Sequence, residues 1–304
     1  MYDICCLGHI TLDKVVTPKA VAYMPGGTSF YFSHAIRQMD VSYCLVTAVA
    51  QPEIPIVSDL RAKGIEVKLL PSAHTVYFEN NYAANPDHRI QKVLQKSDPF
   101  VIDQLMDVQA KIFHLGPLLG DDMPVALIRE LSKRGKISLD VQGYLREVRN
   151  QDVHAIDWAE KKEALQYVDI LKANESEMES ITGHTNVLTG AKVLCGWGVK
   201  EVVITLGSLG SVIYKDNLFY NIPAYSAEDV VDATGCGDTY MAGYLAQRVK
   251  NISIQEAGEF AAAMATLKIE SSGPFTGNRQ DVKVVLRNSM RKMFFAGDLL
   301  QEGI

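Results

Sequence analysis

Short apolar runs alternate with amphipathic segments along most of the chain. The apolar runs predict buried strands at residues 2–7, 43–50, 65–70, 111–115, 136–141, 168–173, 201–206 and 211–214. Apolar residues at helical spacing predict helices at residues 28–39, 54–63, 124–133, 187–197, 239–249, 254–269 and 281–295, and a further helix opens at 174–177. This alternation predicts one α/β domain over residues 1–304, with a doubly wound, mostly parallel sheet and helices on both faces.

One segment breaks the alternation. Residues 75–82 and 89–95 both have the pattern of strands, and the turn-rich residues 85–88 lie between them, so they predict a hairpin. Together with the loosely alternating residues 10–24, this hairpin would form a small sheet outside the main one. The edges of such a sheet carry unpaired backbone groups, and pairing with a second copy is one way to cover them. A homodimer through this sheet is therefore left open.

Composition and charge narrow the class of protein. The chain has 304 residues, of which 47% are hydrophobic and 22% charged, as is ordinary for a globular protein. Its net charge of −6 argues against nucleic acid as a partner, and the lack of a long apolar run argues against a membrane span. The N-terminus lacks the pattern of a signal peptide, and the five cysteines lack the spacing of metal ligands. We expect a soluble, cytoplasmic protein.

The sequence DATGCGD at residues 232–238 carries the clearest chemistry. Gly235, Cys236 and Gly237 lie where a predicted helix begins, and the unpaired N–H groups of that end can bind an anion. A carboxylate beside such a site would repel the anion, unless it accepts a proton from the group that attacks it. This suggests Asp238 as the general base of phosphoryl transfer to a hydroxyl. The simpler alternative is a strand–helix connection with an acidic first turn.

The full heptad closely resembles the signature of the ribokinase/phosphofructokinase-B family of carbohydrate kinases. Further matches follow in family order from Gly8 to about Gly273. The resemblance implies a ribokinase-like fold with a substrate lid formed by about residues 10–24 and 75–95. It also implies an enzyme that uses ATP and Mg²⁺ to phosphorylate a hydroxyl of a sugar or polyol. A lid helps such an enzyme because water must be kept away from the phosphate.

The resemblance also suggests residues that bind the acceptor. In the family, an aspartate after the first strand binds substrate hydroxyls and precedes a glycine pair at a helix start, and Asp13, Gly26 and Gly27 match these positions. A carboxylate suits a vicinal diol because it can accept two hydrogen bonds. The chain departs from the family at Tyr31, where many members carry a substrate-binding asparagine. This tyrosine either faces the core or reshapes the pocket, and both readings argue against ribose or adenosine.

A second polar group follows the strand predicted at 136–141. Asp140, Gln142 and Arg146 offer an acceptor, an amide and a guanidinium at a carboxyl strand end, where ligands bind in parallel sheets. The run DVQGYLR is similar to the corresponding segment of inositol-kinase-like members, so we expect these residues to bind substrate. The alternative is a polar loop with a surface arginine.

Two motifs are expected to bind the nucleotide. Asn174 and Glu177 can be explained as a reciprocal N-cap pair, but the family has an N-x-x-E motif here, whose glutamate helps hold Mg²⁺ and the phosphates through water. Thr205, Gly207 and Gly210 match the T-x-G-x-x-G turn that the family uses at the nucleotide phosphates.

Asp232 and Thr234 precede the anion site. They could supply oxygens to a monovalent cation, as in potassium-activated members of the family, so K⁺ joins ATP and Mg²⁺ among the cofactors that the resemblance suggests. The alternative is that both residues only stabilise the turn.

Other classes of protein fit less well. A NAD-dependent dehydrogenase would carry G-x-G-x-x-G after the first strand, and the chain has neither that pattern nor a Walker A motif. Two alternatives are left open: a degenerate kinase fold that senses a sugar or nucleotide, and a kinase of a nucleoside or sugar phosphate. Tyr31 and the runs DVQGYLR and LKANESE favour a cyclic polyol such as inositol.

Overall fold

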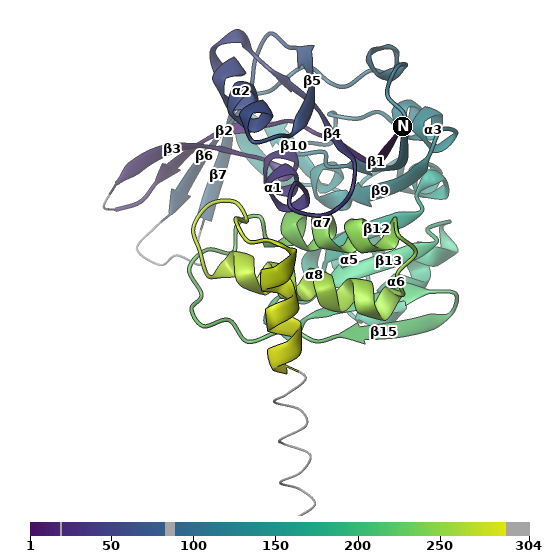
Figure 1. Cartoon of the computed structure of the whole chain (residues 1–304). Coiled ribbons are helices and arrows are strands. Elements are labelled where there is room, and N and C mark those ends of the chain that lie inside the picture. The colour runs from purple at the N-terminus through teal and green to yellow at the C-terminus, as the bar shows by residue number, and fades with distance from the viewer. Residues whose placement is uncertain (19, 83–88, 290–304) are drawn as a thin grey trace, which may run out of the picture.

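Among the residues that the structure describes, the main sheet has nine strands (Figure 1). The computed structural model describes residues 1–18, 20–82 and 89–289, and the strands of this sheet are β1 (Tyr2–Leu7), β4 (Tyr43–Val49), β5 (Glu66–Pro71), β8 (Ala110–Leu115), β9 (Lys136–Asp140), β12 (Ile170–Asn174), β13 (Glu201–Thr205), β14 (Ser211–Lys215) and β15 (Leu218–Ile222). Their order is β15-β14-β13-β12-β9-β8-β1-β4-β5. The pairs from β13 across to β5 are parallel, and the β13–β14 and β14–β15 pairs are antiparallel. The predicted mostly parallel sheet is confirmed.

Helices cover both faces of this sheet: α1 (Thr28–Ile36), α2 (Ile54–Ala62), α3 (Val125–Ser132), α4 (Lys161–Ala164), α5 (Glu175–Thr182), α6 (Val187–Gly196), α7 (Cys236–Arg248) and α8 (Ile254–Ile269). Strands alternate their side chains between the two faces. In β1, Ile4 and Cys6 pack into the core under α1, α2, α7 and α8, whereas Cys5 and Leu7 pack into the core under α3 to α6. Residues 279–289 are also helical, and the rest of the helix predicted at 281–295 lies outside the described residues. Within the described ranges, no helix is both long and apolar enough to cross a membrane.

A second sheet, with six strands in the described ranges, projects from the main one at the left of Figure 1, and we call it the lid. It joins β2 (Thr11–Val16), β3 (Val21–Gly26), β6 (Val76–Tyr82), β7 (Arg89–Gln95), β10 (Arg146–Arg149) and β11 (Asp152–Ala155), in the order β10-β11-β7-β6-β2-β3. The predicted hairpin and its pairing with residues 10–24 are confirmed, and the turn at 85–88 lies outside the described residues. The sequence did not predict β10 and β11, because they are short and largely charged, and each has one valine that packs against the lid.

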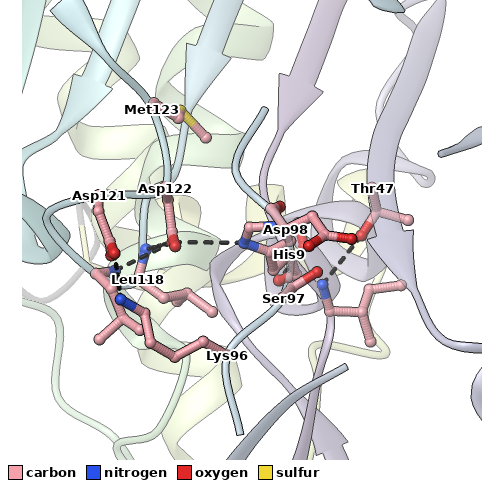
Figure 2. Close-up of polar contacts among 12 residues, drawn as sticks. His9, Thr47, Lys96, Ser97, Asp98, Leu118, Asp121, Asp122 and Met123 are labelled. Atoms are coloured by element: carbon pink, nitrogen blue, oxygen red, sulfur yellow. Dashed lines mark hydrogen bonds and ion pairs between the residues drawn. The ribbon is translucent and has the colours of Figure 1, made fainter. Parts of the chain in front are cut away.

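A buried polar contact joins the lid to the main sheet (Figure 2). His9 is fully buried directly after β1; its Nδ1 lies 3.4 Å from Asp122 Oδ2, and its Nε2 lies 3.1 Å from the carbonyl oxygen of Asp98. The same Asp122 oxygen accepts hydrogen bonds from the amides of Leu118 and Leu119, two residues of the lid core. Burial would raise the pKa of Asp122, but His9 and these amides outweigh it and hold the pKa below its usual value. This contact fixes the loop that carries Leu118.

Candidate active site

A cavity of about 1080 Å³ opens at the carboxyl ends of β9, β12 and β13, beside the lid. Most residues predicted for the site line it, namely Asp13, Gly27, Asp140, Gln142, Arg146, Asn174, Thr205, Gly207, Gly210, Thr234, Gly235, Cys236, Gly237 and Asp238. Three predicted residues, Gly26, Glu177 and Asp232, lie behind this lining, and each contacts a residue that belongs to it. Residues from distant parts of the chain therefore meet at one edge of the sheet, as ligand-binding residues of parallel α/β proteins do.

Asp238 lies in the first turn of α7, at the base of the cavity. The helix predicted to begin at residue 239 begins at Cys236, so the glycine turn is itself the N-terminal turn, with Gly235 as N-cap. Asp238 is half-buried, and burial is the main cause that raises the pKa of its carboxyl to about 7. The carboxylate of Asp140 raises this pKa further, and the ammonium of Lys172 opposes the shift. A carboxyl group with a pKa near 7 can accept a proton from a bound hydroxyl at neutral pH.

Gly235 is a glycine for two reasons. Its φ of 77° lies in the left-handed region, and a Cβ at this position would lie 2.2 Å from Cδ1 of Tyr31. The tyrosine ring therefore packs directly against the turn, and Tyr31 also lines the cavity while it is almost fully buried. Tyr31 thus combines both readings of the sequence, because it belongs to the core and also shapes the pocket.

Lys172 is the residue at the centre of the site that the sequence did not predict. It is buried on β12, with its Nζ 3.0 Å from Asp140 Oδ2 and 3.7 Å from Glu177 Oε2. Burial alone would lower the pKa of Lys172, but Asp140 and Glu177 outweigh it and raise the pKa, so the side chain remains an ammonium. A Cβ on Gly237 would lie 3.3 Å from this Nζ, so the positive charge adjoins the helix turn. Positive charge and helix amides together suit an incoming phosphate.

The lid end of the cavity suits a compound with several hydroxyls. Asp13 lies on β2, and a Cβ on Gly26 would lie 2.5 Å from its Oδ2, so only glycine leaves the carboxylate in place. Phe78 and Leu118 add apolar surface, and Gln91 adds an amide. Such a mixture of apolar faces and hydrogen-bonding groups matches the two kinds of surface of a sugar or polyol ring.

Gln142 is fixed by its neighbours at the end of β9. Its backbone N–H donates to Asp140 Oδ1 at 3.0 Å, and its Nε2 donates to Glu177 Oε1 at 3.3 Å. Arg146 follows at the start of β10 and also lines the cavity. The three predicted residues therefore lie on one continuous edge.

The opposite end of the cavity has the features of a nucleotide site. Gly207 and Gly210 have φ angles of 57° and 95°, and a Cβ on Gly210 would lie 2.1 Å from the carbonyl oxygen of Ile222. The turn after β13 therefore needs both glycines. Beyond it, the wall consists mostly of small and apolar residues: Ala224, Tyr225, Ala262, Ala265, Thr266 and Ile269. Such a wall fits a planar base.

Both carboxylate oxygens of Glu177 accept hydrogen bonds from protein groups. Asn174 and Glu177 form the predicted capping box, in which Glu177 Oε2 accepts from the Asn174 amide at 2.8 Å and Asn174 Oδ1 accepts from the Glu177 amide at 2.8 Å. In the described part of the chain, no group of three or more His, Cys, Asp or Glu side chains is arranged to hold a metal ion. The carboxyl groups of Asp140, Glu177 and Asp238 all lie near the single ammonium of Lys172. This excess of acidic groups is compatible with the positive charge of Mg²⁺ bound to phosphates.

The turn before α7 holds the two residues suggested for a monovalent cation. The amide of Thr234 donates to Asp232 Oδ1 at 2.9 Å, which stabilises the turn. The second oxygen of Asp232 lies 3.5 Å from the ammonium of the buried Lys268. Sequence reasoning missed Lys268, because it lies inside an alanine-rich helix that reads as packing surface.

Like Lys172, the lining residue Thr28 was missed by the sequence analysis. Lys172 stands in the apolar run of β12, where a lone lysine gives no periodic signal, although a lysine in a predicted buried strand is itself unusual. Thr28 lines the cavity at the first residue of α1, and its side chain bonds to Asp238. The Lys172–Asp140 and Thr28–Asp238 contacts both join residues that are far apart in the sequence.

Comparison with known proteins shows similarity to kinases. Residues 75–281 match the model of the pfkB family of carbohydrate kinases. The cytidine kinase of Thermococcus kodakarensis is 28% identical over 268 residues, which covers 84% of this chain and 92% of that protein.

Solved structures of the same fold are also similar. A pyrophosphate-dependent kinase of the ribokinase family, in complex with a pyrophosphate analog and myo-inositol, has a TM-score of 0.84 and 28% identity over 92% of this chain and 99% of its own. Arabidopsis thaliana ribokinase, in complex with ribose and ATP, has a TM-score of 0.79 and 21% identity over 94% and 98% of the two chains, which shows the shared fold. The protein is a phosphotransferase with a ribokinase-like fold, and its chain belongs to the pfkB family of carbohydrate kinases.

Proposed function

We propose that this protein transfers the terminal phosphate of MgATP to a hydroxyl of a cyclic polyol of about the size of inositol. The observation that carries the proposal is Asp238: a carboxyl with a pKa of about 7 in the first turn of α7, beside glycine amides and the ammonium of Lys172. Base, anion site and positive charge lie together at the base of one cavity, as in-line phosphoryl transfer requires.

In this mechanism, Asp238 takes the proton of the acceptor hydroxyl as its oxygen attacks the terminal phosphorus. The bond from that phosphorus to the bridging oxygen breaks, and ADP leaves. The amides of Gly235 to Gly237 and the ammonium of Lys172 stabilise the charge on the transferred group. Mg²⁺, when bound with the nucleotide, neutralises phosphate charge, and Glu177 would hold its waters.

The donor end favours ATP over pyrophosphate. Among the described residues that line the cavity, the cationic side chains are Lys172, which is paired with Asp140, and Arg146, which lies at the start of β10. Free pyrophosphate is held by several basic groups in proteins, because its charge is dense. A small apolar wall serves a nucleoside better. We therefore assign ATP as donor, although three of the similar solved structures are of pyrophosphate-dependent kinases.

The acceptor end favours a polyol over a nucleoside. Tyr31 fills the place next to the anion turn, and Asp13, Gln91 and Gln142 offer polar groups around a compact space. A nucleoside is the second candidate, because the Thermococcus kodakarensis relative is a cytidine kinase. A sensor without activity is not favoured, since Asp238 has the pKa of a working base.

We also infer that the main sheet and the lid belong to one domain. We infer further that two copies of the chain form a homodimer through the lid. The cavity is lined from both sheets, and β3 forms an edge of the lid. On this edge the side chains of Val21 and Tyr23 are 54% and 61% exposed, which is costly for a free surface. We expect Tyr23→Glu to shift the protein toward a monomer in sedimentation velocity. A wild-type monomer at high concentration would contradict this inference.

The test of the proposed activity is ADP release from MgATP with a panel of acceptors. The panel contains inositols, pentoses, ketohexoses, sugar acids, sugar phosphates and nucleosides, and it is repeated with pyrophosphate as donor and phosphate release as readout. We expect one inositol isomer to be the best acceptor, with ATP as donor. Preference for a nucleoside would replace the acceptor, preference for pyrophosphate would replace the donor, and no turnover together with no MgATP binding would refute the proposal.

A further inference from the structure

Lys268 occupies the place at which a monovalent cation would hold the turn before α7. Its side chain has no exposed surface, and it lies in the last turn of α8. Its Nζ donates to the carbonyl oxygen of Asp232 at 2.8 Å and to the carbonyl oxygen of Ser271 at 3.2 Å, and it lies 3.5 Å from Asp232 Oδ2. Two carbonyls and a carboxylate that converge on one point are the ligand type of a dehydrated K⁺. Here they surround an ammonium.

Other polar atoms of the turn are also used by protein groups. Asp232 Oδ1 accepts from the Thr234 amide at 2.9 Å, and the Gly273 amide lies 3.4 Å from Oδ2. The amides of Val231 and Asp232 both donate to the carbonyl of Ile269, at 2.8 and 3.1 Å. The turn is therefore fastened to the end of α8 by backbone bonds, and the ammonium of Lys268 is the positive charge among them.

The residues present do not fit a separate K⁺ ion at Asp232. A cation placed among the same oxygens would lie against the buried ammonium, and two like charges within a few ångström in a desolvated site repel strongly. The ammonium cannot swing into water, because the side chain is enclosed. Burial would raise the pKa of Asp232, but the Thr234 bonds and the charge of Lys268 outweigh it and hold the pKa below its usual value, so the carboxylate stays paired with the lysine.

We propose that Lys268 is a built-in substitute for a monovalent cation, and that it positions the anion turn of this kinase without K⁺. The turn at Asp232 leads within three residues to Gly235, the N-cap of α7, so the ammonium fixes the amides that face the phosphate. Lys268 is a positioning residue, since it does not line the cavity. The proposal rests on the proposed function, because it assigns to the turn the binding of a nucleotide phosphate.

The experiment compares KCl with choline chloride at equal ionic strength, in the full chain. The two readouts are the dissociation constant of MgATP by calorimetry and the midpoint of thermal unfolding without nucleotide. For the wild type, we expect both to be the same in the two salts, with a dissociation constant that changes less than about 2-fold. Lys268→Ala leaves the oxygens and opens the space, so we expect MgATP binding about 10-fold weaker in choline chloride, and recovery in KCl. Its unfolding midpoint should rise in KCl by several degrees.

Two control variants sharpen the comparison. Lys268→Met fills the space without charge, so it should lose affinity in both salts and show no rescue by KCl. Lys250→Ala removes an exposed lysine after α7 and should match the wild type. If Lys268→Ala folds only in KCl, that result supports the proposal directly.

The proposal is overturned if KCl strengthens MgATP binding to the wild type about 10-fold or more, or raises its unfolding midpoint as a site-bound ion would. It is also overturned if Lys268→Ala matches the wild type in choline chloride, or if it loses affinity and KCl restores nothing. Absence of MgATP binding by the wild type in both salts would refute the proposed function instead, and the unfolding midpoints would still decide whether K⁺ occupies the turn.

Discussion

The ammonium of Lys172 lies 3.0 Å from the carboxylate of Asp140, and both side chains are buried at the base of the cavity. This pair links the acceptor edge at Gln142 to the anion turn at Gly237. Because Lys172 also lies near Asp238, it opposes the rise of the pKa of that carboxyl. One side chain therefore influences both the phosphate site and the base.

Replacement of Lys172 tests this double influence. We expect Lys172→Met to lower kcat about 100-fold or more, because the transferred phosphate loses a positive charge. The acid limb of the pH–rate profile should also move upward by about one pH unit, because the carboxyl of Asp238 loses the charge that opposes its raised pKa. Lys192→Met, at an exposed position of α6, is the matched control. An unchanged pH profile in a folded Lys172→Met protein would show that the two groups are not coupled.

Asp238→Asn tests the base itself. The amide cannot accept the proton, so we expect kcat to fall about 100- to 10,000-fold. MgATP should bind with an affinity within about 3-fold of the wild type, since the helix amides are unchanged. Asp229→Asn, at an exposed position before the same turn, should keep full activity. Substantial residual turnover in Asp238→Asn would remove Asp238 as the base.

The pH dependence of activity follows from the pKa of Asp238. The base must be ionised, so we expect kcat/KM to fall below a pH of about 7 and to reach a plateau above it. The measurement is kcat/KM for the acceptor, taken from initial rates between pH 5 and pH 9 with saturating MgATP and a low concentration of acceptor. A profile that is flat through this range would contradict the raised pKa.

Stability should depend on pH in the opposite direction. The pKa of this carboxyl is near 3.8 in the unfolded chain and about 7 in the folded protein. Its contribution to the free energy of unfolding is therefore fully present below pH 3.8 and is lost as the pH rises through about 7. We therefore expect Asp238→Asn to be more stable than the wild type at pH 8, by about 1 to 3 kcal/mol, and to gain little at pH 4. Urea unfolding at both pH values measures the difference. An equal gain at both values would mean that ionisation of Asp238 costs the fold nothing.

Gly235→Ala tests the packing of the anion turn against Tyr31. The φ of 77° alone costs about 1 kcal/mol for alanine, and the Cβ would lie 2.2 Å from the Tyr31 ring. Gly64→Ala is the matched control, because Gly64 has a φ of 81° and no atom within 4 Å of the added Cβ. We expect Gly235→Ala to lose about 2 kcal/mol more stability than Gly64→Ala, together with most activity. Equal losses would show that the ring gives way without cost.

Much of the site was predictable because its signals are local. The start of α7 at Asp232 to Asp238, the capping box of Asn174 and Glu177, and the glycine turn after β13 each lie within a few residues of sequence. Backbone conformation, caps and turns depend on neighbours along the chain, so such motifs are readable without a structure. The alternation of apolar runs and helices likewise predicted the main sheet apart from β15, since most of its strands must present apolar side chains to both helix layers.

What the sequence could not supply is which side chains meet across the fold. Lys172 and Lys268 both stand in apolar segments, and their meaning comes from oxygens that other elements bring to them. Tyr31 reads as a core residue or a pocket residue until α1 is packed against Gly235. Local pattern was enough to predict the family, most of the helices and strands in their order, and the glycine turn at the start of α7. The partners of the buried charges follow from the folded structure alone, because the desolvation and Coulomb energies of a buried ion depend on groups that are close in space and distant along the chain.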